Sequence, residues 1–321
     1  MLNRHFERVT RRRPCEICQH CDWCTYTETI AFCTRVSAGS FRKTANDMYM
    51  HRTQFRPQSE TAKPLASQTS TPRASDEHLD QVYHSFLETL SLSESHTQSL
   101  QDRGLDKAAI QLGAYRSSPT ASLASEIVEK VGRLGLGGVP GFCTNYGKWV
   151  VTKIPSGILI PIRNSTRQIC GIQIRLDDPL SANKYIWFSS SRRDCGTSSG
   201  APIHWCKPEL VTTTRELLIT EGALKASVIG RFLDVPVIGA AGVRSFGRNF
   251  ATTFKANYPN TTVVICFDSD WRSKVNVRNA LSALRGQLTD AGVQWRVRCW
   301  SSEYKGYDDY LLAQFRLGIT E

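Results

Sequence analysis

The 321-residue sequence lacks any apolar run near the roughly 20 residues that a helix needs to span a bilayer. Its basic N-terminal segment is followed by no apolar stretch, so the pattern of a secretory signal is also missing. The glycine-rich stretch 135–141 lacks the Gly-Lys-Ser/Thr of a Walker phosphate loop, which favours a flexible connection there. We therefore expect a cytoplasmic protein with no membrane partner.

The cysteines also lack the distribution of a disulfide framework. Of the eleven, five fall between Cys15 and Cys33, and the others are scattered, several of them inside apolar runs. This usage is typical of a reducing compartment and of a protein with one cysteine metal site.

The net charge is the most informative feature of the composition. A formal charge of +11 favours a polyanionic partner, with nucleic acid ahead of a membrane surface. Charge that serves only solubility is the alternative. A hydrophobic content of 40% supports a core, and the length is sufficient for two domains.

The N-terminal cysteine cluster predicts a structural Zn²⁺ site. Cys15 and Cys18 are two residues apart, and such a turn sets two thiolates about 2.3 Å from one metal. We assign Cys24 and Cys33 as the other ligands, because Cys33 follows an apolar, strand-like segment that can return it to the turn. Cys21 is the alternative to Cys24. A ribbon this small cannot bury a core of its own without the metal.

After the cysteine cluster, the composition and the spacing of apolar residues change along the chain. Residues 51–80 are dominated by Gln, Ser, Thr, Pro and Ala, the composition of a flexible linker. Apolar residues at helical spacing follow, and then strand-like runs that include a hairpin over 157–175. We expect five parts: a zinc-binding module (1–50), a linker (51–80), a small helical unit (81–145), a basic strand-rich subdomain (146–205) and a final domain (206–321).

The final domain contains short apolar runs, each of which leads to a carboxylate. The runs 217–219, 262–267 and 293–300 alternate with segments of helix length, which predicts an α/β fold with a mostly parallel, helix-covered sheet. The carboxyl ends of such strands open onto one crevice, where ligands bind. We therefore expect one acidic edge, formed by Glu221, Asp268, Asp270 and Asp308.

Carboxylates gathered at one edge repel one another unless a cation compensates them. Mg²⁺ suits this role because it binds one or two carboxylates together with substrate phosphates. The sequence therefore predicts a site for Mg²⁺ (or Mn²⁺) that carries out phosphodiester chemistry.

These residues resemble a known domain. Glu221-Gly222 at the end of one strand and Asp268-x-Asp270 at the end of another resemble the Toprim domain of bacterial-type DNA primases, type IA and type II topoisomerases and some nucleases. The cysteine module and the stretches 160–163, 171–175 and 184–185 are similar to the zinc-binding domain and basic subdomain of those primases. Residues 305–309 resemble their late acidic motif. Residues 103–105 and 115–116 are similar to primase-like proteins of phages and plasmids, which are mobile genetic elements.

The resemblance implies a Toprim, Rossmann-like core, preceded by an α+β basic subdomain and an N-terminal zinc ribbon. Two positions depart from the primases: Lys225 stands where they usually carry another acid, and Tyr310 where they carry an aspartate. The site therefore has fewer carboxylates than that of a replicative primase, and whether it holds one metal ion or two is open.

The function that the resemblance implies is DNA primase activity, the synthesis of short primers on single-stranded DNA from nucleoside triphosphates. Glu221 would complete the metal shell or act as general base, and a separate replicative helicase is a candidate partner. The residues expected to contact phosphates of the template or nucleotide are Arg163, Arg175, Lys184, Lys225 and Lys305.

Two other functions are compatible with the same residues. A Toprim nuclease would use the metal to activate water, and a catalytically silent protein would bind DNA as a replication accessory factor. A topoisomerase is not expected, because its tyrosine nucleophile lies on a further large domain for which the chain has no room.

Overall fold

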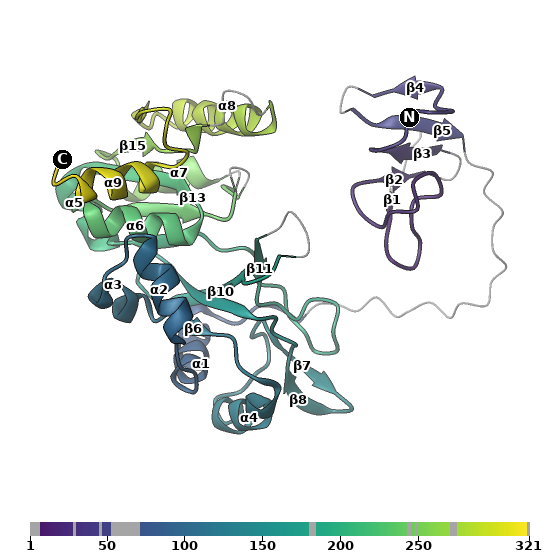
Figure 1. Cartoon of the computed structure of the whole chain (residues 1–321), viewed down its shortest axis with the longest axis horizontal. Coiled ribbons are helices and arrows are strands. Elements are labelled where there is room, and N and C mark those ends of the chain that lie inside the picture. Colours follow the sequence, from purple (N-terminus) through teal and green to yellow (C-terminus); the bar gives the residue numbers. More distant parts are fainter. Residues whose placement is uncertain are drawn as a thin grey trace. The chain divides into compact units, whose positions relative to one another are not determined.

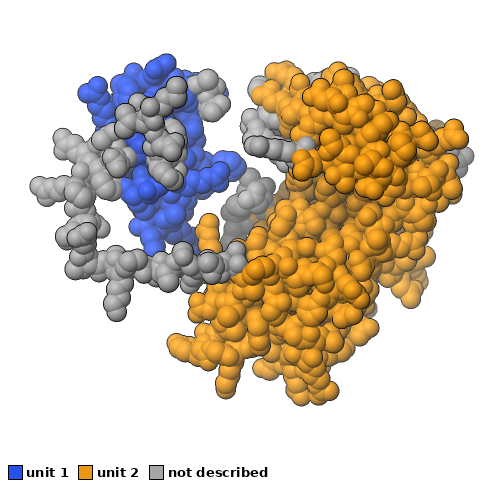
Figure 2. All heavy atoms as spheres, turned by 180° about the vertical axis from the view of Figure 1, so that it is seen from behind, with its two compact units in different colours: residues 1–67 blue, residues 68–321 orange. Residues whose placement is uncertain are grey.

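The computed structural model describes residues 7–27, 30–44, 47–52, 71–179, 184–242, 245–247, 249–269 and 275–319. The chain divides into two compact units, residues 1–67 and 68–321 (Figure 2). Most of the predicted linker, 53–70, lies outside the described residues. Among the residues that are described, no helix has the length and apolar character needed to cross a membrane.

The first unit is an antiparallel sheet of short strands in the order β1-β2-β3-β5-β4 (Figure 1). Its small buried cluster consists of Val9 and three cysteines, with Cys18 packed against them, so thiols occupy the place of an apolar core. The strands are β1 (Glu7–Arg8), β2 (Thr25–Tyr26), β3 (Ile30–Cys33), β4 (Arg42–Lys43) and β5 (Tyr49–Arg52).

The second unit begins with helices. The first, α1, starts where the Ser75 side chain accepts a hydrogen bond from the His78 N–H, and its buried face packs against β10. The helix ends at Glu88, and the next helix begins at Glu94. The helices of this region are α1 (Asp76–Glu88), α2 (Glu94–Asp102), α3 (Lys107–Gly113) and α4 (Ala124–Gly132), with the 3₁₀ turn η1 (Ala121–Leu123).

An antiparallel sheet in the order β11-β10-β9-β6 follows, together with a separate hairpin of β7 and β8. Leu159, Ile172 and Ile174 of this sheet join a core with α1 and α4, whereas Ile158, Ile160 and Ile162 pack against α6. The sheet is therefore covered on both faces. Its strands and the hairpin are β6 (Arg116–Ser117), β7 (Phe142–Asn145), β8 (Lys148–Val151), β9 (Gly157–Arg163), β10 (Ile169–Leu176) and β11 (Tyr185–Trp187).

The C-terminal part contains a second large sheet, in the order β12-β14-β13-β15-β16. All its neighbours pair in parallel except β12, which is antiparallel to β14. Its strands are β12 (His204–Cys206), β13 (Glu216–Glu221), β14 (Val237–Ala240), β15 (Thr262–Ile265) and β16 (Trp295–Val297). Its helices are α5 (Val211–Thr214), α6 (Ala223–Phe232), α7 (Phe250–Asn257), α8 (Val275–Asp290) and α9 (Tyr307–Arg316), with the 3₁₀ turn η2 (Pro208–Leu210).

Helices cover both faces of this sheet. Buried residues of α7 and α8 pack on one face, and those of α6 and α9 pack on the other. The apolar side chains of β13 and β15 divide between the two cores, as expected of strands buried on both sides. The predicted α/β fold with a mostly parallel, helix-covered sheet is confirmed.

The sequence analysis missed strand β14, which lies between β13 and β12. Gly239 allows this strand to approach the start of α6: a Cβ there would lie 2.6 Å from the Gly222 carbonyl oxygen. Because β14 intervenes, β13 is the central strand of the sheet, and its carboxyl end opens in the middle of the edge.

Candidate active site and metal centre

The acidic edge begins at the carboxyl ends of two adjacent strands. Glu221 is the last residue of β13, and Asp268 follows β15 after two buried residues, Cys266 and Phe267. The parallel register pairs Ile219 with Ile265, which brings both strand ends to the same edge. Glu221 is half-buried, and Asp268 is buried. Asp270, the fourth predicted carboxylate, lies outside the described residues.

Asp308 reaches the edge from a helix. The sequence analysis attached this residue to the end of the third apolar run, but it lies in the first turn of α9. The neighbouring acid, Asp309, is exposed and accepts a hydrogen bond from the Gly306 N–H at 3.3 Å. Asp309 therefore caps the helix, while Asp308 turns inward and is only 4% exposed.

The loop before α9 is fixed against the loop after β15. The Ser269 N–H donates to the Lys305 carbonyl at 2.8 Å, and the Ser269 hydroxyl donates to the Tyr304 carbonyl at 3.2 Å. Gly306 is needed for this close approach, because an added Cβ would overlap Asp308 Oδ1 and lie 3.0 Å from Lys225 Nζ. The two loops thus hold Asp268 and Asp308 near each other.

Lys225 lies between these two carboxylates. It sits in the first turns of α6, and its ammonium group contacts Asp268 Oδ1 directly and lies 3.9 Å from Asp308 Oδ1. A second ammonium group, that of Lys305, lies 3.4 Å from Asp268 Oδ2. The Lys225 side chain is 22% exposed, against 61% for Lys305, so the two lysines differ in their access to solvent.

Burial and charge oppose each other in this group. Burial alone would lower the pKa of Lys225, but the negative charges of Asp308 and Asp268 outweigh it and raise that pKa above its usual value. Burial, with the nearby charges of Asp309 and Asp268, raises the pKa of Asp308 in spite of Lys225. Lys225 therefore stays charged at neutral pH.

The acidic edge suits a divalent ion only in part. Carboxylate oxygens are Mg²⁺ ligands, and Asp308 Oδ1 is buried without a hydrogen bond, as expected of an atom that awaits a cation. However, the position between Asp268 and Asp308 is already taken by the Lys225 ammonium. Within the described part of the chain, the cysteine cluster is the only group of three or more candidate ligands close enough to share an ion.

The predicted basic residues do not form one patch. Arg163 ends β9 next to the hairpin turn, whereas Arg175 pairs with Ile158 near the opposite end, roughly 16 Å along the strand. Arg163 is half-buried, and burial lowers its pKa. Arg175 donates to the Ser99 hydroxyl at 3.1 Å, and Lys184 is exposed just before β11. Phosphate binding by these residues stays a prediction.

The cysteine cluster has the geometry of a four-ligand metal centre. The sulfur atoms of Cys15, Cys18, Cys24 and Cys33 all lie within 4.8 Å of one another. Cys21 is exposed and lies outside the cluster, so of the two alternatives left open by the sequence the geometry favours Cys24. Three of the four thiols are buried.

Backbone and side-chain donors surround these sulfurs. The N–H groups of Arg35 and Val36 point at Cys33 Sγ at 3.4 and 3.3 Å, as is typical of the groups that orient thiolate ligands. The Arg35 guanidinium lies 3.9 Å from Cys24 Sγ and pairs with Asp22 at 2.8 Å. The sequence analysis did not foresee this contact, because Arg35 approaches the cluster only when β3 folds back.

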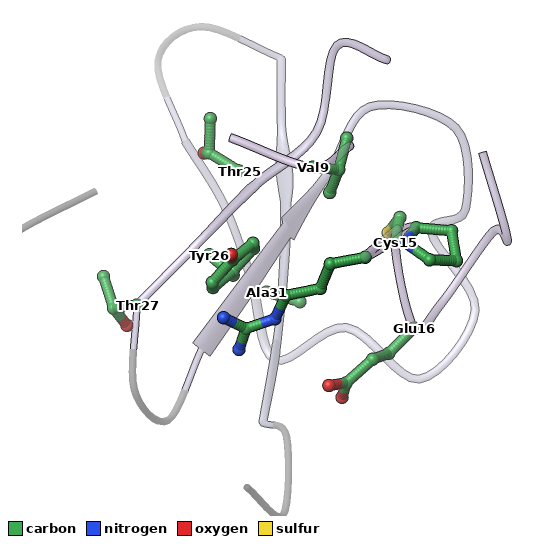
Figure 3. Close-up of a pocket in the computed structure, with 9 residues that line it drawn as sticks. Val9, Cys15, Glu16, Thr25, Tyr26, Thr27 and Ala31 are labelled. Carbon is green, nitrogen blue, oxygen red and sulfur yellow. The ribbon is translucent and has the colours of Figure 1, made fainter. Parts of the chain in front are cut away.

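One side of the cluster borders a small pocket. Cys15, Tyr26 and Ala31 line it (Figure 3), and the Arg13 guanidinium stacks over the Tyr26 ring at 3.6 Å. Trp23 is 74% exposed in the same unit. Aromatic and basic side chains thus lie at the surface around the thiols.

Comparison with known proteins agrees with this architecture. The family described as "Domain of unknown function (DUF3854)" matches residues 210–316, which contain the parallel strands of the sheet that carries the acidic edge but not β12. No curated protein matched the chain in a sequence search.

Several solved primase structures share the fold. The zinc-binding and RNA polymerase domains of Aquifex aeolicus primase match 75% of this chain, with 16% identity and a TM-score of 0.59; the match spans 59% of that chain. The RNA polymerase domain of Mycobacterium tuberculosis primase DnaG, in complex with a double-stranded DNA oligomer with an overhang, matches 76% of this chain and 81% of its own, with 16% identity and a TM-score of 0.57.

A DnaG primase catalytic domain bound to single-stranded DNA is a third neighbour, with 16% identity and a TM-score of 0.54 over 74% of this chain and 75% of that one. The parallel sheet, the antiparallel sheet before it and the N-terminal four-cysteine cluster thus occur in the order that the sequence resemblance implied. The chain has the fold of a bacterial DnaG primase catalytic core.

Proposed function

We propose that the chain is a primase-like nucleotidyltransferase that makes short primers on single-stranded DNA. The observation that carries the proposal is the meeting of Asp268 and Asp308, from a strand end and a helix start, at the carboxyl edge of a parallel sheet in a primase-like fold. Two of the structural neighbours, one bound to single-stranded DNA and one to an overhang duplex, support a DNA template. The charge of +11 supports the same partner.

The proposed reaction joins two nucleotides. The 3′-hydroxyl oxygen of one attacks the α-phosphorus of an incoming nucleoside triphosphate, a new P–O bond forms, and the bond to pyrophosphate breaks. Bound Mg²⁺ (or Mn²⁺) would supply charge neutralisation at the phosphates, and its candidate ligands are Glu221, Asp268, Asp270 and Asp308.

The chain's own side chains supply the rest of the site. Glu221, at the end of the central strand, completes the ligand set or accepts the hydroxyl proton. Lys305 lies at the exposed rim, where its ammonium group can turn from Asp268 to a triphosphate. Arg163, Arg175 and Lys184 contact the backbone of template or primer in this proposal, which makes binding sensitive to salt.

We also propose that the cysteine cluster holds Zn²⁺. Four cysteine sulfurs, here within 4.8 Å of one another, are the ligand set of many structural zinc sites. The exposed Trp23, together with nearby basic side chains, gives this unit the stacking and charge that single-stranded DNA requires.

A second candidate function is a replication accessory role without catalysis. The contact between Lys225 and Asp268 favours it, because an ammonium group among the carboxylates competes with a catalytic ion. The two functions differ in a simple assay with single-stranded DNA, labelled ribonucleotides and Mg²⁺ or Mn²⁺.

In this assay, a primase makes short labelled RNA, and Asp268→Ala and Glu221→Ala each reduce the product by at least about a hundredfold, since each removes charge stabilisation at the reacting phosphates. DNA binding without product would support the accessory role. Cleavage of the DNA in the absence of nucleotides would support a nuclease and contradict the proposal.

A further inference from the structure

Lys225 occupies a position that is unusual for a surface lysine. Its ammonium group is held between carboxylates from two separate elements, Asp268 after β15 and Asp308 in α9. The backbone that carries it is anchored, because Ala223, Leu224 and Ala226 of the same helix are buried in two hydrophobic cores. The position of this charge is therefore set by the fold.

The two aspartates are matched by two lysines without an ion. Asp268 and Asp308 contribute two negative charges, and Lys225 and Lys305 contribute two positive charges at the distances given above. A divalent ion bridging the two aspartates would need oxygen ligands at about 2.1 Å in a near-octahedral arrangement. The Lys225 ammonium occupies that space, and Gly306 closes it from the side of the α9 loop.

The two lysines are not equivalent. The Lys305 side chain is 61% exposed, and its ammonium group lies 3.4 Å from the outer oxygen of Asp268. Lys225 is 22% exposed and faces both carboxylates, and its removal would leave two buried negative charges side by side. Lys225 is thus the residue that decides whether a cation is needed between them.

We infer that Lys225 is a built-in cation that replaces one divalent ion, so that the acidic edge binds no metal between Asp268 and Asp308. This inference rests on the proposed function, which takes the acidic edge as the site of divalent ions. It adds how many such ions the edge binds. Lys225 thus determines how many divalent ions the acidic edge binds.

The test counts bound ions in the full-length, zinc-loaded chain. Mn²⁺ is titrated into wild type, Lys225→Gln and Lys225→Arg, and bound ions are counted by electron paramagnetic resonance, without nucleotides and without measuring activity. We expect Lys225→Gln to bind one more Mn²⁺ than wild type, and Lys225→Arg to bind the same number as wild type, because arginine keeps the charge.

Thermal unfolding of the same proteins provides a second readout. Without added Mn²⁺, Lys225→Gln should melt on the order of 5–10 °C below wild type, because it removes the ammonium group that faces both buried carboxylates and leaves Lys305 near Asp268 alone. Saturating Mn²⁺ should restore most of the loss. The double variant Lys225→Gln/Asp308→Asn removes one of those carboxylates, so it should melt higher than Lys225→Gln and bind no additional ion.

Two results would overturn the inference. Equal ion counts in wild type and Lys225→Gln would mean that Lys225 does not exclude an ion, and a gained ion that persists in the double variant would mean that it binds elsewhere. Failure of the proposed function is a separate result: wild type would then make no primer with Mg²⁺ or Mn²⁺, whatever the ion counts.

Discussion

The cysteine cluster and the acidic edge are both candidate metal centres, but they relate to their folds in opposite ways. Three of the four cysteines form most of the buried cluster of a unit whose strands are two to four residues long. The carboxylates stand at the edge of a sheet that buries large apolar clusters on both faces and already carries an internal cation. A metal at the first site would hold the fold together, whereas a metal at the second would serve chemistry.

Removal of zinc should have the largest effect on folding. If the first unit stayed folded, the contrast between a structural and a chemical metal site would be wrong. We expect chelation, or Cys15→Ser, to unfold residues 7–52, because structural zinc contributes on the order of 10 kcal/mol to such a small unit. Limited proteolysis should then cut this segment while the residues from 71 onward stay protected. Cys21→Ser is the matched control, since the exposed Cys21 lies outside the cluster, and it should leave the proteolysis unchanged.

The adjacent pair Asp308 and Asp309 gives a sharper test at the acidic edge. Asp308→Asn should lower primer synthesis by about a hundredfold, because it removes a buried charge that faces Lys225. Asp309→Asn should keep most of the activity, since asparagine also caps a helix start. Equal losses in both variants would show that the inward turn of Asp308 has no functional meaning.

Gly306→Ala tests how tightly the edge is packed. The new methyl group would displace the Asp308 carboxylate, and we expect a loss of about 1–3 kcal/mol in the free energy of unfolding, measured by urea denaturation. Gly286→Ala, in α8, meets no atom within 4 Å and should instead stabilise by about 0.5–1 kcal/mol. If both substitutions had the same sign, the close approach at position 306 would be refuted.

The smallest effect is expected on DNA affinity. Lys184→Ala should weaken single-stranded DNA binding slightly and reduce the slope of log K against log salt concentration by about 0.7, the value for one phosphate contact. Fluorescence anisotropy at several salt concentrations measures this slope. Lys148→Ala, on the separate β7–β8 hairpin, is the control, and an identical change there would indicate general charge attraction instead of a defined contact.

The difference between the cysteine cluster and the acidic edge also explains which features could be predicted from the sequence. The four cysteines all lie within residues 15–33 and two of them share one turn, so their clustering could be predicted from their spacing. The strands β13 and β15 were predicted because each is a continuous apolar run that ends in a carboxylate. Strand β14 was missed, because its run of apolar residues is short, contains Gly239 and does not end in a carboxylate.

The role of Lys225 could be anticipated only in part. The sequence identified Lys225 as a departure from the primases and as a phosphate contact, and its position four residues after Glu221 is one helical turn on. Its contact with Asp268 depends on the pairing of β13 with β15, and its approach to Asp308 depends on how α9 packs against α6. Contacts between residues so far apart in the chain have no local signal.

Helix α6 links the two large sheets of the second unit. Ala223, Leu224 and Val228 pack against the antiparallel sheet that ends at Arg163, while Ala226 and Ile229 pack against the parallel sheet. A helix clamped from both sides cannot rotate or slide without disturbing both layers. The antiparallel sheet and the Lys225 ammonium group are therefore held by the same helix, so a displacement of either sheet would also move Lys225 relative to Asp268 and Asp308.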